Sequence, residues 1–283
     1  MKIGMMFANV AFFGTRDGAA KVAQAAEDAG LESLWTVEHV VIPEGYESAY
    51  PYSPSGKMPG GETAPIPDPL AWLSYVSALT TTVRLATGIV ILPQRNPVIL
   101  AKEVATIDVL SGGRMTLGVG IGWLAEEFNV IGVPFEERTQ RTDEYIQAMR
   151  ALWSQDETFE GRFTKFQNAR SNPKPIQAGG VPIVVGGHTK GAARRAGRLG
   201  DGFFPARGDM PVLLEEMKRA AKDAGRNPDA IEVTTGGGPN VDAAKALGDL
   251  GVSRIVLPPP TFDPNDMARA LGEISENFIQ KIA

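Results

Sequence analysis

From residue 184 the chain reads Val184-Val185-Gly186-Gly187-His188-Thr189-Lys190-Gly191-Ala192-Ala193-Arg194-Arg195. This pattern predicts a buried strand, a glycine turn and then a helix that ends at Gly200. Glycines let backbone N–H groups approach a ligand closely, and the first turn of a helix carries unpaired N–H groups with partial positive charge. The junction therefore suits a phosphate, and Lys190, Arg194 and Arg195 add positive charge. An ordinary helix capped by Thr189 fits the same residues.

The position of this stretch decides between two folds. Short β-rich runs alternate with helical patterns along the chain, and we expect strands at 2–7, 31–37, 83–91, 114–120, 182–185, 202–204, 231–234 and 254–257. Continuous apolar strands alternating with helices indicate a parallel sheet closed as a single-domain TIM (β/α)8 barrel over residues 1–283. The alternative is an open doubly wound sheet. A Rossmann fold carries its phosphate glycines after the first strand, where Phe7-Ala8-Asn9-Val10 has none, so the barrel is favoured.

Helix start and stop signals support this alternation. Asp68-Pro69 and Asn96-Pro97 each combine a capping side chain with a proline at the first helical position. We expect helices at 16–29, 69–80, 97–110, 138–153, 211–224, 241–250 and 266–282. Two long connections interrupt the pattern, as insertions after the second and fourth strands. The first reaches about residue 67 and is expected to be a lid or a substrate-binding wall, and the second includes a small hairpin near Glu160-Gly161.

Composition excludes several classes of site and partner. The chain has no cysteine, which excludes disulfides, thiolate metal sites and cysteine nucleophiles. Its formal net charge is −5 with both signs interspersed, which argues against nucleic acid and membrane partners. The N-terminus does not resemble a signal peptide, and no apolar run approaches a membrane span of about 18 residues. We therefore expect a cytoplasmic protein.

The chain has two histidines, and both follow predicted strands. His39 comes after the second strand together with Glu38, and His188 lies in the glycine turn after the fifth. The carboxyl ends of barrel strands carry the active site of barrel enzymes, and a histidine there suits general acid or base catalysis. Two separated histidines with scattered carboxylates form no recognisable metal-ligand spacing, so no metal is expected.

Six motifs follow one another along nearly the whole chain. They are Thr87-Gly88-Ile89-Val90-Ile91-Leu92-Pro93, Arg95-Asn96-Pro97, Leu110-Ser111-Gly112-Gly113-Arg114, Gly118-Val119-Gly120-Ile121-Gly122-Trp123, Gly132-Val133-Pro134-Phe135 and Ala196-Gly197-Arg198-Leu199-Gly200-Asp201-Gly202. Together they resemble the motifs of the bacterial luciferase-like family of flavin- and coenzyme F420-dependent enzymes. The similarity is closest to its F420-dependent oxidoreductase branch.

The resemblance implies site residues. It places a non-prolyl cis peptide at Gly88-Ile89, where a bulge supports the flavin or deazaflavin ring, and a cofactor phosphate in the loop from Gly186 to Arg194. It makes His39 and Glu38 the expected catalytic residues, with His39 giving or taking the proton that accompanies hydride transfer. The expected cofactor-binding residues are Ala8, Glu38, His39, Thr87, Gly88, Ile89, Gly120, Gly122, Trp123, Gly186, Gly187, His188, Thr189, Lys190 and Arg194.

The implied function is an F420-dependent oxidoreductase that transfers a hydride between the deazaflavin and a small organic substrate, in a protein expected to be a homodimer. An FMN-dependent two-component monooxygenase and a non-catalytic flavin- or deazaflavin-binding protein are the alternatives. F420-dependent glucose-6-phosphate dehydrogenases carry a tryptophan and a glutamate where this chain has Pro43 and Trp123. This departure argues against a sugar phosphate and for an apolar or aromatic wall, and leaves open whether Glu126 faces the cofactor.

Overall fold

A closed parallel barrel forms the centre of the computed structural model, which describes residues 1–282; residue 283, the last of the expected domain, lies outside the described residues. The strand order in the sheet is β3-β2-β1-β11-β10-β9-β8-β5-β4, and pairing of β3 with β5 closes the ring. The strands are β1 (Lys2–Met5), β2 (Ser33–Thr36), β3 (Arg84–Thr87), β4 (Val90–Ile91), β5 (Met115–Gly120), β8 (Ile183–Gly186), β9 (Gly202–Phe204), β10 (Glu232–Gly236) and β11 (Arg254–Leu257).

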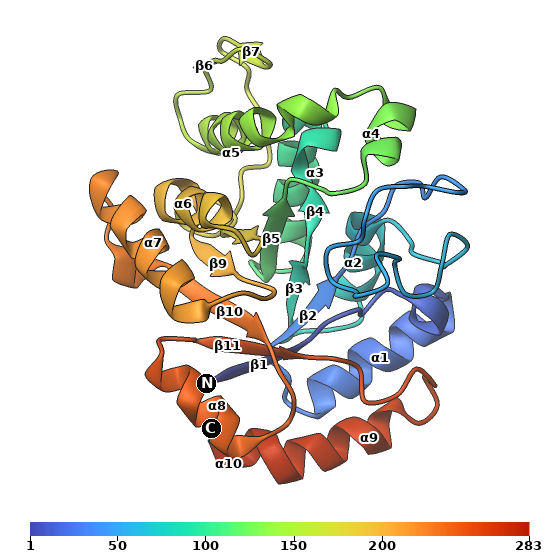
Figure 1. Ribbon diagram of the computed structural model, residues 1–283. Helices are drawn as coiled ribbons and strands as arrows, with labels where there is room; N and C mark the ends of the chain where they lie inside the picture. The colour runs from blue at the N-terminus through green and yellow to red at the C-terminus, as the bar shows by residue number, and fades with distance from the viewer. Residues whose placement is uncertain (283) are drawn as a thin grey trace.

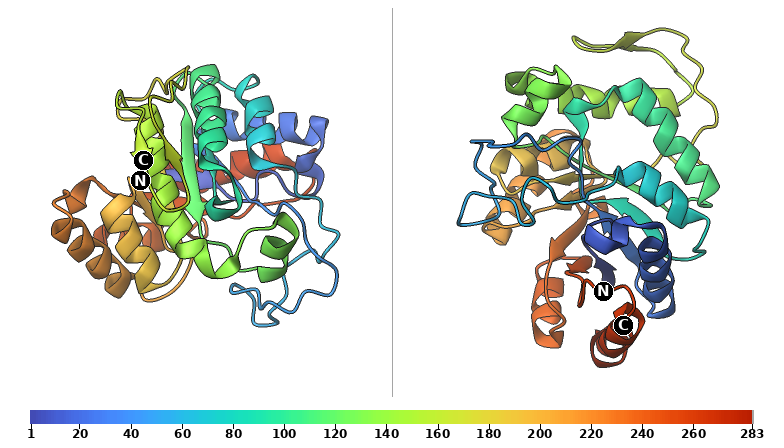
Figure 2. Two further views of the ribbon diagram at one scale, coloured as in Figure 1. Left: turned by 90° about the horizontal axis from the view of Figure 1, so that it is seen from above. Right: turned by 90° about the vertical axis from the view of Figure 1, so that its right-hand side faces the viewer.

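Helices cover the outside of this barrel, as Figure 1 and both views of Figure 2 show. They are α1 (Arg16–Asp28), α2 (Pro69–Ser77), α3 (Pro97–Leu110), α4 (Ala125–Ile131), α5 (Arg138–Trp153), α6 (Lys190–Leu199), α7 (Met210–Asp223), α8 (Val241–Asp249), α9 (Met267–Ile274) and α10 (Gln280–Ile282). Short 3-10 turns lie at Ala11–Gly14, Leu92–Gln94, Phe135–Glu137 and Pro228–Ala230. The expected TIM barrel is confirmed.

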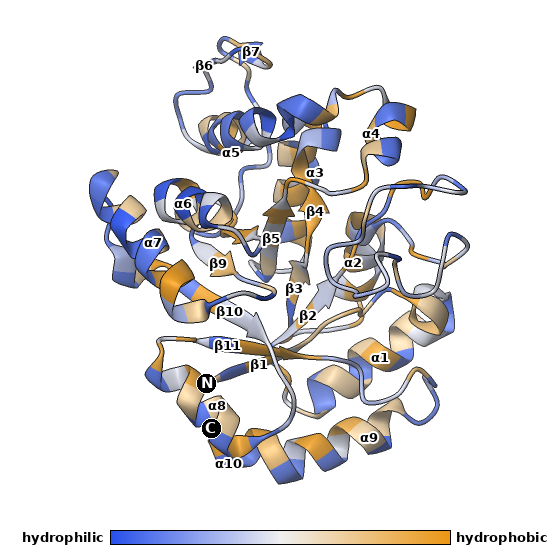
Figure 3. Cartoon of the chain, in the orientation of Figure 1, coloured by the Kyte–Doolittle hydropathy of each residue, from blue (hydrophilic) through white to orange (hydrophobic). Residues whose placement is uncertain are grey.

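Burial on both faces explains why the strands are apolar throughout. All six residues of β5 are buried, because its inner face fills the barrel and its outer face meets helices. Figure 3 shows the same contrast, with β3, β4 and β5 in hydrophobic colours and the outward side of α7 in hydrophilic ones. The capping signals also hold: Asp68 accepts hydrogen bonds from the N–H groups of Leu70 and Ala71, which starts α2.

The predicted third strand is interrupted where the resemblance placed a bulge. β3 and β4 occupy one position in the barrel, since both pair with β5. The peptide between Gly88 and Ile89, which separates them, is cis. Other expectations were wrong in extent. The helix expected at 69–80 ends at Ser77, and the strand expected at 31–37 covers Ser33–Thr36. The first strand ends at Met5, because Phe7 has a φ of 57° and turns the chain, and the last helix contains a π-helical segment at Ser275–Ile279.

Both predicted insertions are present. Residues 37–68 contain no helix or strand, and in Figure 1 this segment lies beside α4 and α2. After β5 the chain forms α4, α5 and a two-stranded hairpin of β6 (Phe159–Glu160) and β7 (Lys165–Phe166), where the sequence predicted one. Figure 1 shows that this hairpin stands away from the barrel.

No helix within residues 1–282 combines the length and the apolar character that a membrane crossing requires. The same residues hold no group of three or more histidine, aspartate and glutamate side chains arranged to bind a metal ion.

Candidate functional site

The expected site residues converge on one end of the barrel. Because all the barrel strands are parallel, their carboxyl ends meet at one rim, which we call the mouth. Fourteen of the fifteen expected cofactor-binding positions lie at or directly after these strand ends; the exception, Arg194, is considered below. They are contributed by the turn after β1, the start of the 37–68 segment, the β3–β4 junction, the end of β5 and the turn after β8.

Three glycines of β5 and β8, two of them among the expected site residues, make room for the bulge. A Cβ atom on Gly120 would lie 2.8 Å from Cδ1 of Ile89, and one on Gly186 would lie 2.7 Å from its Cγ2. A Cβ on Gly118 would lie 1.8 Å from the carbonyl oxygen of Thr87, whose hydroxyl donates to the Gly118 carbonyl over 2.7 Å. The motif glycines of β5 and β8 are therefore explained by packing against the bulge.

Glu38 anchors the segment that follows the bulge. Its Oε2 accepts the backbone N–H of Ile91 over 2.5 Å, and its Oε1 accepts Nε of Arg95 over 2.9 Å and also Nη2. Arg95 in turn donates to Asp68, the cap of α2, over 2.6 Å. Burial alone would lower the pKa of the Arg95 guanidinium, but Glu38 and Asp68 raise it above its ordinary value. Both oxygens of the Glu38 carboxylate are thus occupied by protein donors.

His39 pairs with a carboxylate that the sequence did not point to. Its Nδ1 lies 3.1 Å from Oε2 of Glu127 in α4, and the two side chains are 8% and 0% exposed. Oε1 of Glu127 accepts the backbone N–H groups of Val40 and Val41 over 2.6 and 3.3 Å. The partners are 88 residues apart in the chain, so spacing alone gave no signal. Glu127 fixes both the ring of His39 and the backbone beyond it.

Glu126, the neighbouring acid, faces the 37–68 segment. Its Oε1 accepts the N–H groups of Glu47 and Ser48 over 2.7 and 3.0 Å. Burial would raise the pKa of this carboxyl, but the hydrogen bonds from Ser48 and the loop backbone lower it to about 2. Glu126 therefore ties the insertion down over α4.

Aromatic rings of the 37–68 segment surround Trp123. The ring centroids of Tyr46 and Tyr50 lie 5.6 and 5.2 Å from that of Trp123, in edge-to-face geometry. The ring of His39 lies 5.7 Å from the same tryptophan. Such contacts are typical of aromatic packing and give one side of the mouth an aromatic wall. Tyr46 is also covered by the Lys57 ammonium, 4.0 Å from its centroid.

The glycine turn after β8 meets this wall through its histidine. The ring of Tyr52 lies 5.4 Å from that of His188, and Nη2 of Arg207 lies 3.4 Å from Nε2 of His188. Burial, followed by the charge of Arg207, lowers the pKa of His188. Its Nδ1 is buried and makes no hydrogen bond within residues 1–282. Arg207, in the loop after β9, is the cation that the sequence reasoning missed.

The start of α6 fits both interpretations of the opening stretch. Thr189 caps the helix by accepting the N–H of Ala192 over 3.2 Å, and Gly187 has a φ of 132° that favours glycine. Lys190 is exposed beside the turn. Arg194 points to α7 instead, where it forms an ion pair with Glu216 at 2.7 Å. Arg194 is therefore set apart from the other expected cofactor-binding residues.

Gln94 is the most unusual polar residue near the mouth. It follows β4, is 8% exposed, and neither its Nε2 nor its Oε1 has a hydrogen-bond partner within the described residues. A buried amide without partners is costly, and such a group calls for a specific explanation. Together with Nδ1 of His188, it marks hydrogen-bonding capacity that the protein itself does not use.

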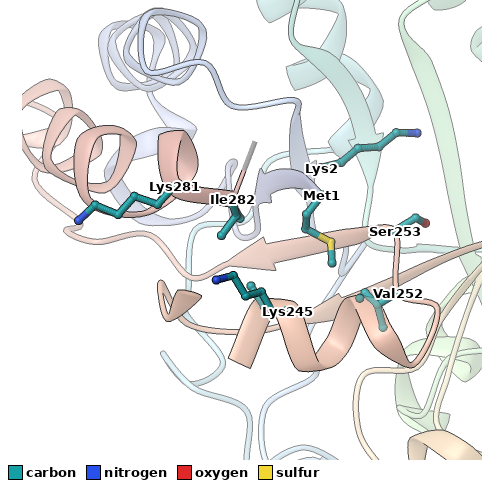
Figure 4. Close-up of a pocket in the computed structure, with 9 residues that line it drawn as sticks. Met1, Lys2, Lys245, Val252, Ser253, Lys281 and Ile282 are labelled. Atoms are coloured by element: carbon teal, nitrogen blue, oxygen red, sulfur yellow. The ribbon is translucent and has the colours of Figure 1, made fainter. Parts of the chain in front are cut away.

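A separate hollow of about 600 Å³ lies at the opposite end of the barrel. Figure 4 shows Met1 and Ile282, from the two ends of the chain, around this hollow together with Lys245 of α8. Its lining includes three lysines but no histidine or carboxylate side chain, and none of the expected site residues. The chemistry expected from the sequence therefore concentrates at the mouth.

Comparison with known proteins bears on this site. Residues 5–247 match the family model of luciferase-like monooxygenases. An uncharacterized protein of Mycobacterium tuberculosis is 33% identical over 274 residues, which cover 92% of this chain and 94% of that protein. The F420-dependent glucose-6-phosphate dehydrogenase of Kineococcus radiotolerans is 30% identical over 284 residues, covering 93% and 77%. The structure of an F420-dependent secondary alcohol dehydrogenase with an F420–acetone adduct has a TM-score of 0.78, 19% identity and coverage of 100% and 99%, which shows a shared fold.

Proposed function

The chain belongs to the luciferase-like monooxygenase family, and from this premise we propose that it is a coenzyme F420-dependent oxidoreductase acting on a small organic molecule. The observation that carries the proposal is His39 at the mouth of the barrel, held at Nδ1 by Glu127 and beside Trp123. Nε2 of His39 makes no hydrogen bond to any described residue, so this atom is available to a ligand. A relative 30% identical across most of this chain is named for its dependence on F420, which supports the choice of cofactor.

The polar groups of the mouth fit a heterocycle that carries a phosphate. The unpaired amide of Gln94 offers one donor group and one acceptor, as the edge of a heterocyclic ring requires. The N-terminus of α6, Arg207 and the unpaired Nδ1 of His188 would hold the phosphate, and the Gly88-Ile89 bulge would support the ring. Bound F420 supplies a two-electron hydride carrier.

The protein's own part is to place the substrate, exclude water and move one proton. We assign the proton to Nε2 of His39. Glu38 acts as a positioning residue, because its carboxylate is occupied by Ile91 and Arg95. The aromatic wall around Trp123, which Tyr52 extends through its contact with Tyr50, favours an apolar or aromatic substrate over a sugar phosphate.

Parallel titration of the purified protein with F420 and with FMN tests the cofactor. We expect F420 to bind more tightly than FMN. Quenching of the intrinsic fluorescence of the protein measures both affinities. Tighter binding of FMN would favour the two-component monooxygenase instead. Hydride transfer to any enone of a test panel, or from any alcohol of a second panel, would exclude the alternative that the chain is a non-catalytic cofactor-binding protein.

Substitution of the histidine tests the proton assignment. His39→Ala should lower turnover by about 10²-fold or more, the usual contribution of a general acid or base. The affinity for F420 is measured on the same variant, so that a loss of turnover at saturating cofactor is separated from a loss of cofactor binding. Unchanged turnover in this variant would contradict the assignment to His39.

We also propose that the protein is a homodimer that pairs through α2 and α3. Tyr75 of α2, Leu79 just after this helix, and Ile99 and Leu110 of α3 are exposed, although the two helices pack against each other. Apolar side chains that gather on an exposed surface are typical of a protein–protein contact. Analytical ultracentrifugation should give a dimer for the native protein and a monomer for Ile99→Glu; a native monomer would contradict the proposal.

A further inference from the structure

We infer that Glu127 is a positioning residue that sets the tautomer of His39, so that Nε2 faces the substrate without a proton in the neutral ring. This inference rests on the proposed function, in which His39 handles the proton. The sequence reasoning singled out Glu126, one residue earlier in α4, and did not use Glu127.

The hydrogen bonds at Glu127 determine which nitrogen of His39 carries the proton. A carboxylate only accepts hydrogen bonds, so Nδ1 of His39, 3.1 Å from Oε2, must donate. A neutral imidazole carries one proton, and Nε2 is then the acceptor. The Glu127 side chain is fully buried, so water does not compete for its oxygens.

The second oxygen keeps the carboxylate in this orientation. Oε1 accepts the N–H groups of Val40 and Val41, which are backbone donors that cannot become acceptors. The same carboxylate therefore fixes the ring of His39 and the backbone that follows it at Val40 and Val41. Edge-to-face contact with Trp123 limits rotation of the ring from another side.

Glu127→Gln separates the two tasks of the side chain without changing its shape. A glutamine has one oxygen, and the two backbone donors require it. Its NH2 group then faces Nδ1 of His39 and donates, so the imidazole must place its proton on Nε2. The variant therefore keeps the hydrogen bonds from the backbone of Val40 and Val41 and reverses the tautomer of His39.

Nitrogen-15 NMR of protein labelled at histidine reads the tautomer directly, without cofactor or substrate. The chain has two histidines, so His188→Gln assigns the remaining signals to His39. We expect the neutral ring of His39 to be protonated at Nδ1 in the native protein and at Nε2 in Glu127→Gln. The matched control is Glu126→Gln, which neutralises the neighbouring acid and should leave the tautomer unchanged. A native ring protonated at Nε2, or the same tautomer in both proteins, would overturn the inference.

Kinetics then connect the tautomer to turnover. With an identified alcohol substrate, Glu127→Gln should lower kcat by about 100-fold and leave KM within about twofold. The two proposals fail separately. Loss of turnover in His39→Ala combined with an unreversed tautomer would reject the positioning role alone, whereas a reversed tautomer combined with an active His39→Ala would reject the proton role alone.

Discussion

The two ends of the barrel differ in how completely their buried polar groups are paired. At the amino ends of the strands, Arg254 is 3% exposed and its guanidinium donates to Glu32 over 2.7 and 2.8 Å. Nearby, all five N–H donors of Arg114 meet oxygen atoms, from Ser77, Thr80, Val83 and Ser111. At the mouth, Gln94, Glu126 and His188 each keep at least one buried polar atom without a partner in residues 1–282.

This difference separates stability from function. Buried charges that are fully paired gain no further hydrogen bonds from a ligand. Removing one partner of such a pair lowers the free energy of unfolding by several kcal/mol, because the other charge stays buried without a partner. Unpaired groups in a mouth are costly in the free protein and regain their hydrogen bonds when a ligand supplies them. The amino end of the barrel therefore holds the fold, and the mouth is the place where binding is expected.

The largest effect is expected at the amino end. Arg254→Met should leave Glu32 and Glu232 facing each other without their shared cation, and lower the free energy of unfolding by about 3 kcal/mol. Urea denaturation measures this change. The matched control is Arg219→Met on α7, an exposed arginine in a surface pair, which should change stability by about 0.5 kcal/mol or less. Equal changes in the free energy of unfolding for the two variants would contradict the difference proposed between buried and exposed pairs.

At the mouth, we expect that replacing a buried polar side chain raises the stability of the protein. Gln94→Leu replaces an amide without partners by an apolar group of similar size, and should raise the free energy of unfolding by about 1 kcal/mol. The same change should weaken F420 binding by about tenfold, the equivalent of one charge-free hydrogen bond in a buried site. Calorimetric titration and urea denaturation give the two values. A loss of stability would mean that Gln94 has a structural partner after all.

Acid should weaken the attachment of the 37–68 segment to α4. The folded protein holds the pKa of Glu126 at about 2, below the ordinary value of 4.5, so its contribution is complete above pH 4.5 and is lost as the pH falls toward 2. The stability difference between the native protein and Glu126→Gln should therefore shrink over that range. Urea denaturation at several pH values measures it, and a constant difference would contradict the role of the carboxylate.

The smallest effect concerns the charge beside the glycine turn. Burial and then the charge of Arg207 lower the pKa of His188, so Arg207→Gln should raise this pKa but leave in place the larger lowering that burial causes. Histidine NMR across pH 5–8 measures the shift. A titration that stays in place would show that burial accounts for the whole effect and that the two side chains are not coupled.

Sequence periodicity and capping signals predicted most of the elements. The helices at 97–110 and 138–153 match to the residue. The first begins with the Asn96-Pro97 cap and both carry a buried apolar face, and these are local properties. The hairpin near Glu160 and the interruption at Gly88-Ile89 were also anticipated. Strand ends were less accurate: the first strand stops two residues early at the left-handed Phe7, and a π-helical segment interrupts the last helix.

The sequence by itself determined that eight strands alternate with helices, that the glycine turn follows the fifth strand, and that Glu38 and His39 follow the second. These are properties of neighbouring residues. Only the tertiary structure decided what surrounds them: Glu127 beside His39, Arg95 on Glu38, Arg207 beside His188, and an unpaired Gln94. Such contacts arise when barrel closure brings distant strand ends to one rim, and no local pattern in the chain records which side chains then meet.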